Sequence, residues 1–181
     1  MHRLIGLLAL APACFGGIDS NGERTADTGP IADPRPMDPV DTQMIGVASD
    51  VDELHQINKM PYPSTVGSFN INVFVSQKSK DFQKIHPEST GSRVSLPVGT
   101  LIVRQVLDAN GQVTKVTLMG KGPAGYDPTL GDWWFGVTDP SGVPLVDDAG
   151  PQVGRLTQCH GCHLPRADDD YLFGVPEADQ R

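Results

Sequence analysis

An α+β domain, built mainly from an antiparallel β-sheet with a few helices, is the fold class that the sequence predicts. Residues 69–75, 100–107 and 113–119 are rich in β-branched and aromatic side chains with polar interruptions, which favours strands. Asp108-Ala109-Asn110-Gly111 joins the last two segments as a hairpin turn. Residues 131–137 form a further candidate strand, closed by the turn at 139–142. Consecutive strands with short connections pair antiparallel, and this sets the fold class.

Two segments show helical spacing. In residues 47–58, Val51, Leu54 and His55 fall on one helical face. In residues 76–86, Phe82 and Ile85 are the apolar anchors and Ser76 is a suitable N-cap. The sequence therefore predicts a short helix in each segment.

The N-terminus has the pattern of an export signal. A short basic start, with Arg3, precedes an apolar run over residues 4–11 that is too short to span a bilayer. Cys14 follows small residues and resembles a lipobox cysteine, although the leucine usual three places before it stands at Leu10. We therefore expect a signal peptide over 1–13 and lipidation of Cys14. Ordinary signal cleavage, with Cys14 left as a stray thiol, is the alternative.

Composition divides the rest of the chain. Residues 14–45 are dominated by Gly, Asp, Thr and Pro and contain too few large apolar side chains to offset the entropy of ordering, which predicts a disordered tether. Residues 46–181 are enough for one domain. Without residues 1–13 the chain has 13 Lys and Arg against 22 Asp and Glu, a net charge of about −9. An acidic surface argues against nucleic acid as a partner and is compatible with a basic redox partner protein.

Cys159-His160-Gly161-Cys162-His163 is a C-x-x-C-H sequence, the attachment signature of a covalent c-type haem. Two thiols about one helical turn apart form thioethers with the porphyrin vinyl groups, and the following imidazole reaches the iron. The alternatives are a Cys159–Cys162 disulfide, a thioredoxin-like redox pair and half of a zinc site. Attachment of haem c happens after export, which agrees with the N-terminal signal. We predict that the fold ends in a haem-attachment helix with His163 as the metal ligand.

Four segments follow one another over roughly residues 63–173: LPVGTLIVRQ, MGKGPAGYDPTLGDWWFGV, CHGCH and DDDYLF. In this order they resemble the cytochrome P-460 family and the related cytochromes c′-beta. The resemblance implies a small antiparallel sheet with a C-terminal C-x-x-C-H and a homodimer. It also implies one haem c that is five-coordinate or weakly six-coordinate. Cys159 and Cys162 would hold it, His163 would be proximal, and residues of the sheet would cover the distal side.

Arg104 departs from that family. It stands where a lysine of the P-460 enzymes cross-links to the porphyrin, and a guanidinium is a poor nucleophile. The carboxylate that serves those enzymes as proton acceptor should fall near Thr117, yet no Asp or Glu lies between Val113 and Lys121. We therefore expect no cross-link and no hydroxylamine oxidation. Strand alternation puts Arg104 beside Ile102 and Val106, where a haem propionate or a polar ligand on iron would pair with it. A surface salt bridge is the alternative.

These features predict an exported mono-haem cytochrome of the periplasm or cell envelope, anchored by lipid, that binds small gaseous ligands such as nitric oxide at an open distal face. A haem oxidoreductase, acting on hydroxylamine or nitric oxide or in a peroxidase-like way, is the first alternative. The second is an electron-transfer cytochrome, which needs a strong sixth ligand. Met119 and His86 are the best placed candidates for that ligand, although core packing is the commoner role of a strand methionine. Side chains point to opposite faces in turn along a strand, so Trp133, Trp134 and Phe135 cannot all face one way. We therefore expect at least one of them at an interface or over the haem.

Overall fold

The computed structural model describes residues 39–48, 50–76, 80–88 and 90–181. The expected signal peptide, Cys14 and most of the expected tether lie outside these residues.

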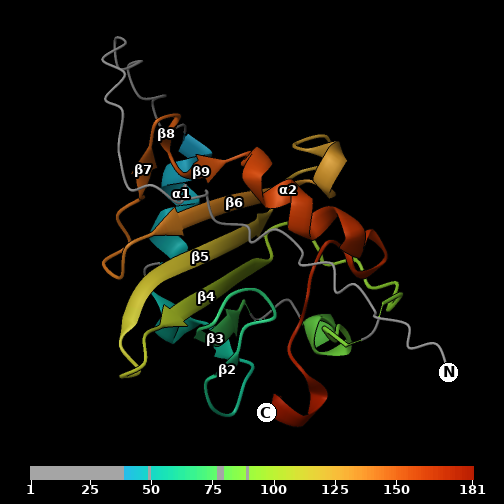
Figure 1. The fold of residues 1–181 in the computed structure, drawn as a ribbon. Helices are drawn as coiled ribbons and strands as arrows, with labels where there is room; N and C mark the ends of the chain where they lie inside the picture. The colour runs from blue at the N-terminus through green and yellow to red at the C-terminus, as the bar shows by residue number, and fades with distance from the viewer. Residues whose placement is uncertain (1–38, 49, 77–79, 89) are drawn as a thin grey trace, which may run out of the picture.

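A seven-stranded antiparallel sheet forms the body of the domain (Figure 1). The strand order is β1-β3-β4-β5-β6-β9, and β2 pairs with β3 beside β1. The strands are β1 (His55–Gln56), β2 (Tyr62–Pro63), β3 (Asn70–Val75), β4 (Leu101–Leu107), β5 (Val113–Lys121), β6 (Trp133–Thr138) and β9 (Val153–Gly154), and β7 (Val146–Asp147) with β8 (Gly150–Pro151) makes a small second sheet. The α-helices are α1 (Pro39–Ala48) and α2 (Thr157–His163). The predicted α+β class is confirmed.

Short 3-10 helices complete the described fold: η1 (Val51–Glu53), η2 (Lys80–Lys84), η3 (Pro128–Leu130), η4 (Leu164–Asp169) and η5 (Glu177–Asp179). No helix within the described ranges is long and apolar enough to cross a bilayer.

The hairpin between β4 and β5 is confirmed. Asp108 Oδ1 accepts the backbone N–H groups of Asn110 at 2.8 Å and of Gln112 at 2.9 Å, and these bonds hold the pKa of Asp108 below its usual value. Gly111 takes the left-handed conformation that the turn requires, with φ of 79°. The turn chemistry in the sequence thus fixes the register of the two central strands.

The helix expected over 47–58 is wrong for most of its length: α1 ends at Ala48, and only Val51–Glu53 is helical among residues 50–58, as η1. After η1, His55 and Gln56 pair with Val75 and Phe74 as β1. Hydrogen bonding to the edge of β3 therefore overrides the helical spacing. The helix expected over 76–86 is reduced to η2 within the described residues, although Phe82 and Ile85 are buried anchors as predicted.

The two faces of the sheet bury two separate apolar clusters. One face of the sheet lies toward α2 and is called the α2 face. Cys159 and Tyr171 pack against its apolar side chains, which are those of Ile71, Val73, Ile102, Val106, Met119, Trp133 and Phe135. The α1 face carries Leu101, Val103, Val116, Leu118, Trp134 and Val153, against which Met44 and Ile45 of α1 pack. Because side chains alternate along β6, Trp134 points away from its neighbours and toward α1. The ribbon shows α1 behind the sheet and α2 beside β6 on the other side (Figure 1).

Helix α1 begins before the domain boundary that we expected at residue 46. Asp41 is fully buried and its Oδ1 accepts the indole N–H of Trp134 at 2.8 Å. Gly120 lies so close to α1 that an added Cβ would stand 1.8 Å from Met44 Cε. The ordered domain therefore includes residues 39–48, because a buried tryptophan on the sheet supplies the partner that the local sequence lacks.

Replacing Asp41 with Ala should lower the free energy of unfolding by about 1–3 kcal/mol, because it leaves the buried indole N–H of Trp134 without an acceptor. Asp50 is exposed, and Asp50→Ala is the matched control, with an expected change within about 0.5 kcal/mol. Urea unfolding of both variants measures the difference. Equal midpoints for the two variants would show that α1 does not contribute to the fold.

Candidate haem-attachment site

Helix α2 carries all three residues of the C-x-x-C-H signature. It starts after Leu156, whose carbonyl accepts the N–H of Cys159 at 3.0 Å, and continues into η4, where Pro165 occupies the first turn. Residues three apart on a helix share one face, so Cys159 and Cys162 lie on the same side of α2. His163 follows as the last residue of the helix. This is the arrangement expected from the sequence.

His163 is held by one backbone group. Its Nδ1 lies 2.6 Å from the carbonyl oxygen of Tyr171. Because a carbonyl only accepts, Nδ1 carries the proton and Nε2 bears the lone pair. A hydrogen bond of this kind fixes the tautomer and the ring orientation of a metal-ligating histidine.

The surroundings of the His163 ring keep it neutral. Phe135 and Phe173 pack edge-on against it, with ring centroids at 5.3 and 5.4 Å. Burial lowers the pKa of His163 to about 4; the Tyr171 hydrogen bond opposes this shift, and the positive fields of Arg104 and His160 add to it. A neutral imidazole with a lone pair on Nε2 is the form that binds a metal.

The pKa of His163 predicts a pH dependence for the protein made without haem. The unfolded chain binds the proton near pH 6.5 and the folded chain only near pH 4, so this stability is present above pH 6.5 and lost as pH falls toward 4. The free energy of unfolding should fall by about 1 kcal/mol per pH unit between pH 6.5 and 5. Denaturant unfolding at several pH values measures the slope. His163→Gln should flatten it, and an unchanged slope would contradict the burial of a neutral ring.

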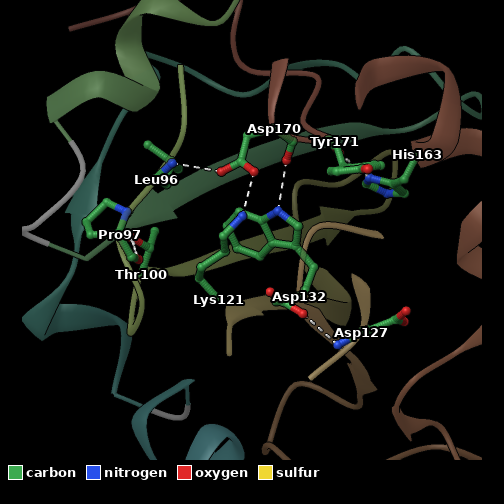
Figure 2. Close-up of polar contacts among 10 residues, drawn as sticks. Leu96, Pro97, Thr100, Lys121, Asp127, Asp132, His163, Asp170 and Tyr171 are labelled. Carbon is green, nitrogen blue, oxygen red and sulfur yellow. Dashed lines mark hydrogen bonds and ion pairs between the residues drawn. The ribbon is translucent and has the colours of Figure 1, made fainter. Parts of the chain in front are cut away.

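A buried ion pair supports the carbonyl that holds His163 (Figure 2). Lys121 Nζ lies 2.5 Å from Asp170 Oδ1, and Asp170 Oδ2 accepts the N–H of Leu96 at 2.8 Å. Trp133 Nε1 donates to the backbone oxygen of Asp170 at 2.8 Å. These contacts hold Asp170 and Tyr171 in left-handed conformations, with φ of 52° and 64°, and so aim the Tyr171 carbonyl at Nδ1.

The cysteines differ in state. Cys159 is a free thiol packed against the α2 face, and burial raises its pKa to about 12. Cys162 is disulfide-bonded, so it must be reduced before it can form a thioether. A Cys159–Cys162 disulfide is therefore not formed. A thioredoxin-like pair needs a thiol with a lowered pKa, which Cys159 does not have. Within the described part of the chain no three His, Cys, Asp or Glu side chains gather as a metal-binding group.

Arg104 lies in the middle of β4, between Val73 of β3 and Thr117 of β5. It shares the α2 face with Ile102 and Val106, as strand alternation predicts. Its Nη2 donates to Ser64 Oγ at 3.0 Å. The residue is half-buried, and burial lowers its pKa, although a guanidinium remains charged at any physiological pH.

Arg104 makes no salt bridge with any described carboxylate, so the surface salt bridge that we considered for it is not found there. Tyr62, the neighbour that opposes the Arg104 shift, has a pKa raised to about 12 by burial. Sequence reasoning missed both Ser64 and Tyr62. Only the pairing of β2 with β3 brings them to Arg104.

The two candidates for a sixth ligand, Met119 and His86, lie in different parts of the fold. Met119 is buried on the α2 face, where it pairs with Ile102 and Phe135 across the sheet. His86 is half-buried, and its Nδ1 lies 3.4 Å from Gln180 Nε2. Only Met119 therefore shares the sheet face that packs against Cys159.

His160 lies between the two cysteines, with Nε2 3.8 Å from Asp127 Oδ2. This contact is too long for a hydrogen bond, so the buried Nε2 atom has no hydrogen-bond partner among the residues that the structure describes. His160 is thus placed toward the loop before η3, whereas His163 is placed against Tyr171.

The donor set fits a covalent haem. Two cysteines lie one turn apart, a neutral imidazole has its lone pair on Nε2, and the neighbouring side chains are apolar. Cys159, Cys162 and His163 would hold the haem, and Phe135 and Phe173 are the aromatic side chains beside the His163 ring. No protein-family model matches this chain, and no curated protein matches it either.

Proposed function

We propose that this protein is an exported mono-haem c-type cytochrome that binds small gaseous ligands, nitric oxide among them. The single observation that supports it most is the contact of His163 Nδ1 with the Tyr171 carbonyl, because it leaves the lone pair of Nε2 free to bind iron on the residue that directly follows Cys162. The resemblance to the P-460 and c′-beta cytochromes adds the expectation of an open distal face. Export, a lipid anchor at Cys14, a homodimer and a redox partner protein belong to the same proposal. Lipidation and haem attachment both need free thiols, so the form proposed here is one in which the disulfide of Cys162 is reduced.

Each residue has a separate task in this proposal. Cys159 and Cys162 would fix the haem through thioethers, and His163 Nε2 would bind its iron. The haem, when bound, supplies an iron atom able to take a diatomic ligand. The Tyr171 carbonyl keeps the proton on Nδ1, and Lys121 with Asp170 keeps that carbonyl in place. Apolar side chains of the α2 face would exclude water from the ligand side.

Two other functions compete with gas binding. An electron-transfer cytochrome is favoured by Met119, which lies on the α2 face and would serve as a strong sixth ligand. A haem oxidoreductase is favoured by Arg104, whose charge could polarise a bound oxygen species.

The absorption spectrum of the reduced protein separates the three. A broad five-coordinate spectrum that changes on adding carbon monoxide or nitric oxide is the expected result. Sharp α and β bands that resist both gases would indicate a six-coordinate electron carrier. A red-shifted Soret band would indicate a cross-linked, P-460-type enzyme. Either of the last two spectra would overturn the proposal of gas binding.

No cross-link to the porphyrin is expected, because Arg104 cannot supply a neutral nucleophile. Two lysines, Lys115 and Lys121, lie on β5, the strand that pairs with that of Arg104. Lys121 forms an ion pair with Asp170, and its Nζ lies 4.8 Å from the centre of the Trp133 ring. Lys115, the other, lies 6.0 Å from the centre of the Phe69 ring. Peptide mapping of the haem peptide by mass spectrometry should find haem on residues 159 and 162 only, and hydroxylamine oxidation should be negligible. Haem on a peptide containing Lys115 would contradict this.

A further inference from the structure

We propose that Arg104 and Ser64 form a binding site for a small inorganic anion on the sheet side of the haem pocket, so that the ferric protein takes an anionic ligand there. The proposal rests on the proposed haem function and adds a second class of ligand to it. Its basis is the arrangement of hydrogen-bond donors on the α2 face.

Arg104 has hydrogen-bond donors that the described residues do not use. A guanidinium has five N–H donors and no acceptor. Only Nη2 has a protein partner among the described residues, the hydroxyl of Ser64 at 3.0 Å. A half-buried cation with so few protein partners retains a positive field and several N–H groups that an added anion could accept from.

Ser64 supplies a second donor. The residue is only 9% exposed, and its Oγ accepts two hydrogen bonds, from Arg104 Nη2 and from the backbone N–H of Val66 at 3.2 Å. With both acceptor positions used, the hydroxyl proton has no acceptor among the described residues. An anion beside Arg104 would accept from the guanidinium and from this hydroxyl together.

Arg104 lies on the sheet face that also contacts His163. Arg104 is the next residue after Ile102 on the same face of β4. Ile102 pairs with Met119 of β5, and Met119 pairs with Phe135 of β6. Phe135 contacts the His163 ring, with the ring centroids 5.3 Å apart. Arg104 thus lies on the same face of the sheet as Phe135, the side chain that contacts His163 of α2.

A haem propionate is the other anion that could pair with Arg104, but the position favours a ligand on iron. Arg104 is central both along β4 and across the sheet, and apolar side chains of the α2 face surround it. A propionate with two charged oxygens prefers a solvent-facing rim.

Azide binding to the ferric haem protein tests the site, with carbon monoxide binding to the ferrous protein as the neutral comparison. Arg104→Gln should raise the azide Kd about tenfold or more, and Ser64→Ala about threefold, because charge-assisted hydrogen bonds are lost. Both should change the carbon monoxide Kd less than about threefold. Arg93 is exposed, and Arg93→Gln controls for the loss of one positive charge.

An azide Kd that rises no more in Arg104→Gln than in Arg93→Gln would overturn the proposal. So would an equal loss of azide and carbon monoxide affinity, or an unchanged azide Kd with a shifted reduction potential, which is the result expected for a propionate partner. If Arg104→Gln does not fold, the Ser64→Ala comparison decides by the same criteria. A wild-type protein without haem would refute the proposed function, and this inference with it. A haem-loaded protein with unaltered azide binding would refute only the inference.

Discussion

Replacing both Cys159 and Cys162 with Ala should abolish covalent haem, because no other described cysteine lies near His163. Each single variant keeps one possible thioether and should retain haem at a yield reduced several-fold. The protein is produced in a host that exports it and attaches haem c, then denatured, and the haem that remains on the chain is measured on a gel.

Two variants within α2 serve as controls. His160→Ala removes a side chain that lies toward Asp127, and it should leave attachment intact. His163→Gln should keep the thioethers but change the spectrum, since the axial nitrogen is lost. Covalent haem in the double cysteine variant would contradict the assignment of both attachment residues.

Replacing Lys121 with Met should have the largest effect on folding. The change leaves the Asp170 carboxylate buried without its cation, which costs about 3–5 kcal/mol of the free energy of unfolding. Lys84 makes a similar ion pair with Asp81 at the surface, with both side chains more than half exposed, so Lys84→Met is the matched control. That variant should lose less than about 1 kcal/mol.

Denaturant unfolding of the two variants gives the comparison. The loop that Asp170 anchors also carries the Tyr171 carbonyl, so Lys121→Met should weaken the orientation of His163 as well. Equal losses for Lys121→Met and Lys84→Met would show that the buried pair does not hold this loop.

The sequence was sufficient to predict the strands that became β3, β4, β5 and β6, because each has a local pattern of β-branched and aromatic residues and one pair has an explicit turn. It failed for α1 and β1. Both depend on partners far along the chain: Trp134 accounts for the burial of Asp41, and Val75 pairs with His55. The spacing of apolar residues within one segment cannot indicate a contact with a residue far along the chain.

The same division applies to the site. C-x-x-C-H identifies Cys159, Cys162 and His163 without a structure, and alternation along a strand places Arg104. The Tyr171 carbonyl could not be predicted, because it depends on two consecutive non-glycine residues in the left-handed conformation. Nor could Ser64, which reaches Arg104 only through the pairing of β2 with β3.

Above all, we propose that a haem is covalently attached at α2. The intact mass of the denatured wild-type chain, exported by a host that attaches haem c, tests it most directly. We expect the mass of the processed polypeptide plus one haem, with the haem located on the peptide that contains Cys159 and Cys162. A mass equal to the polypeptide alone, with haem absent or released on denaturation, would contradict it.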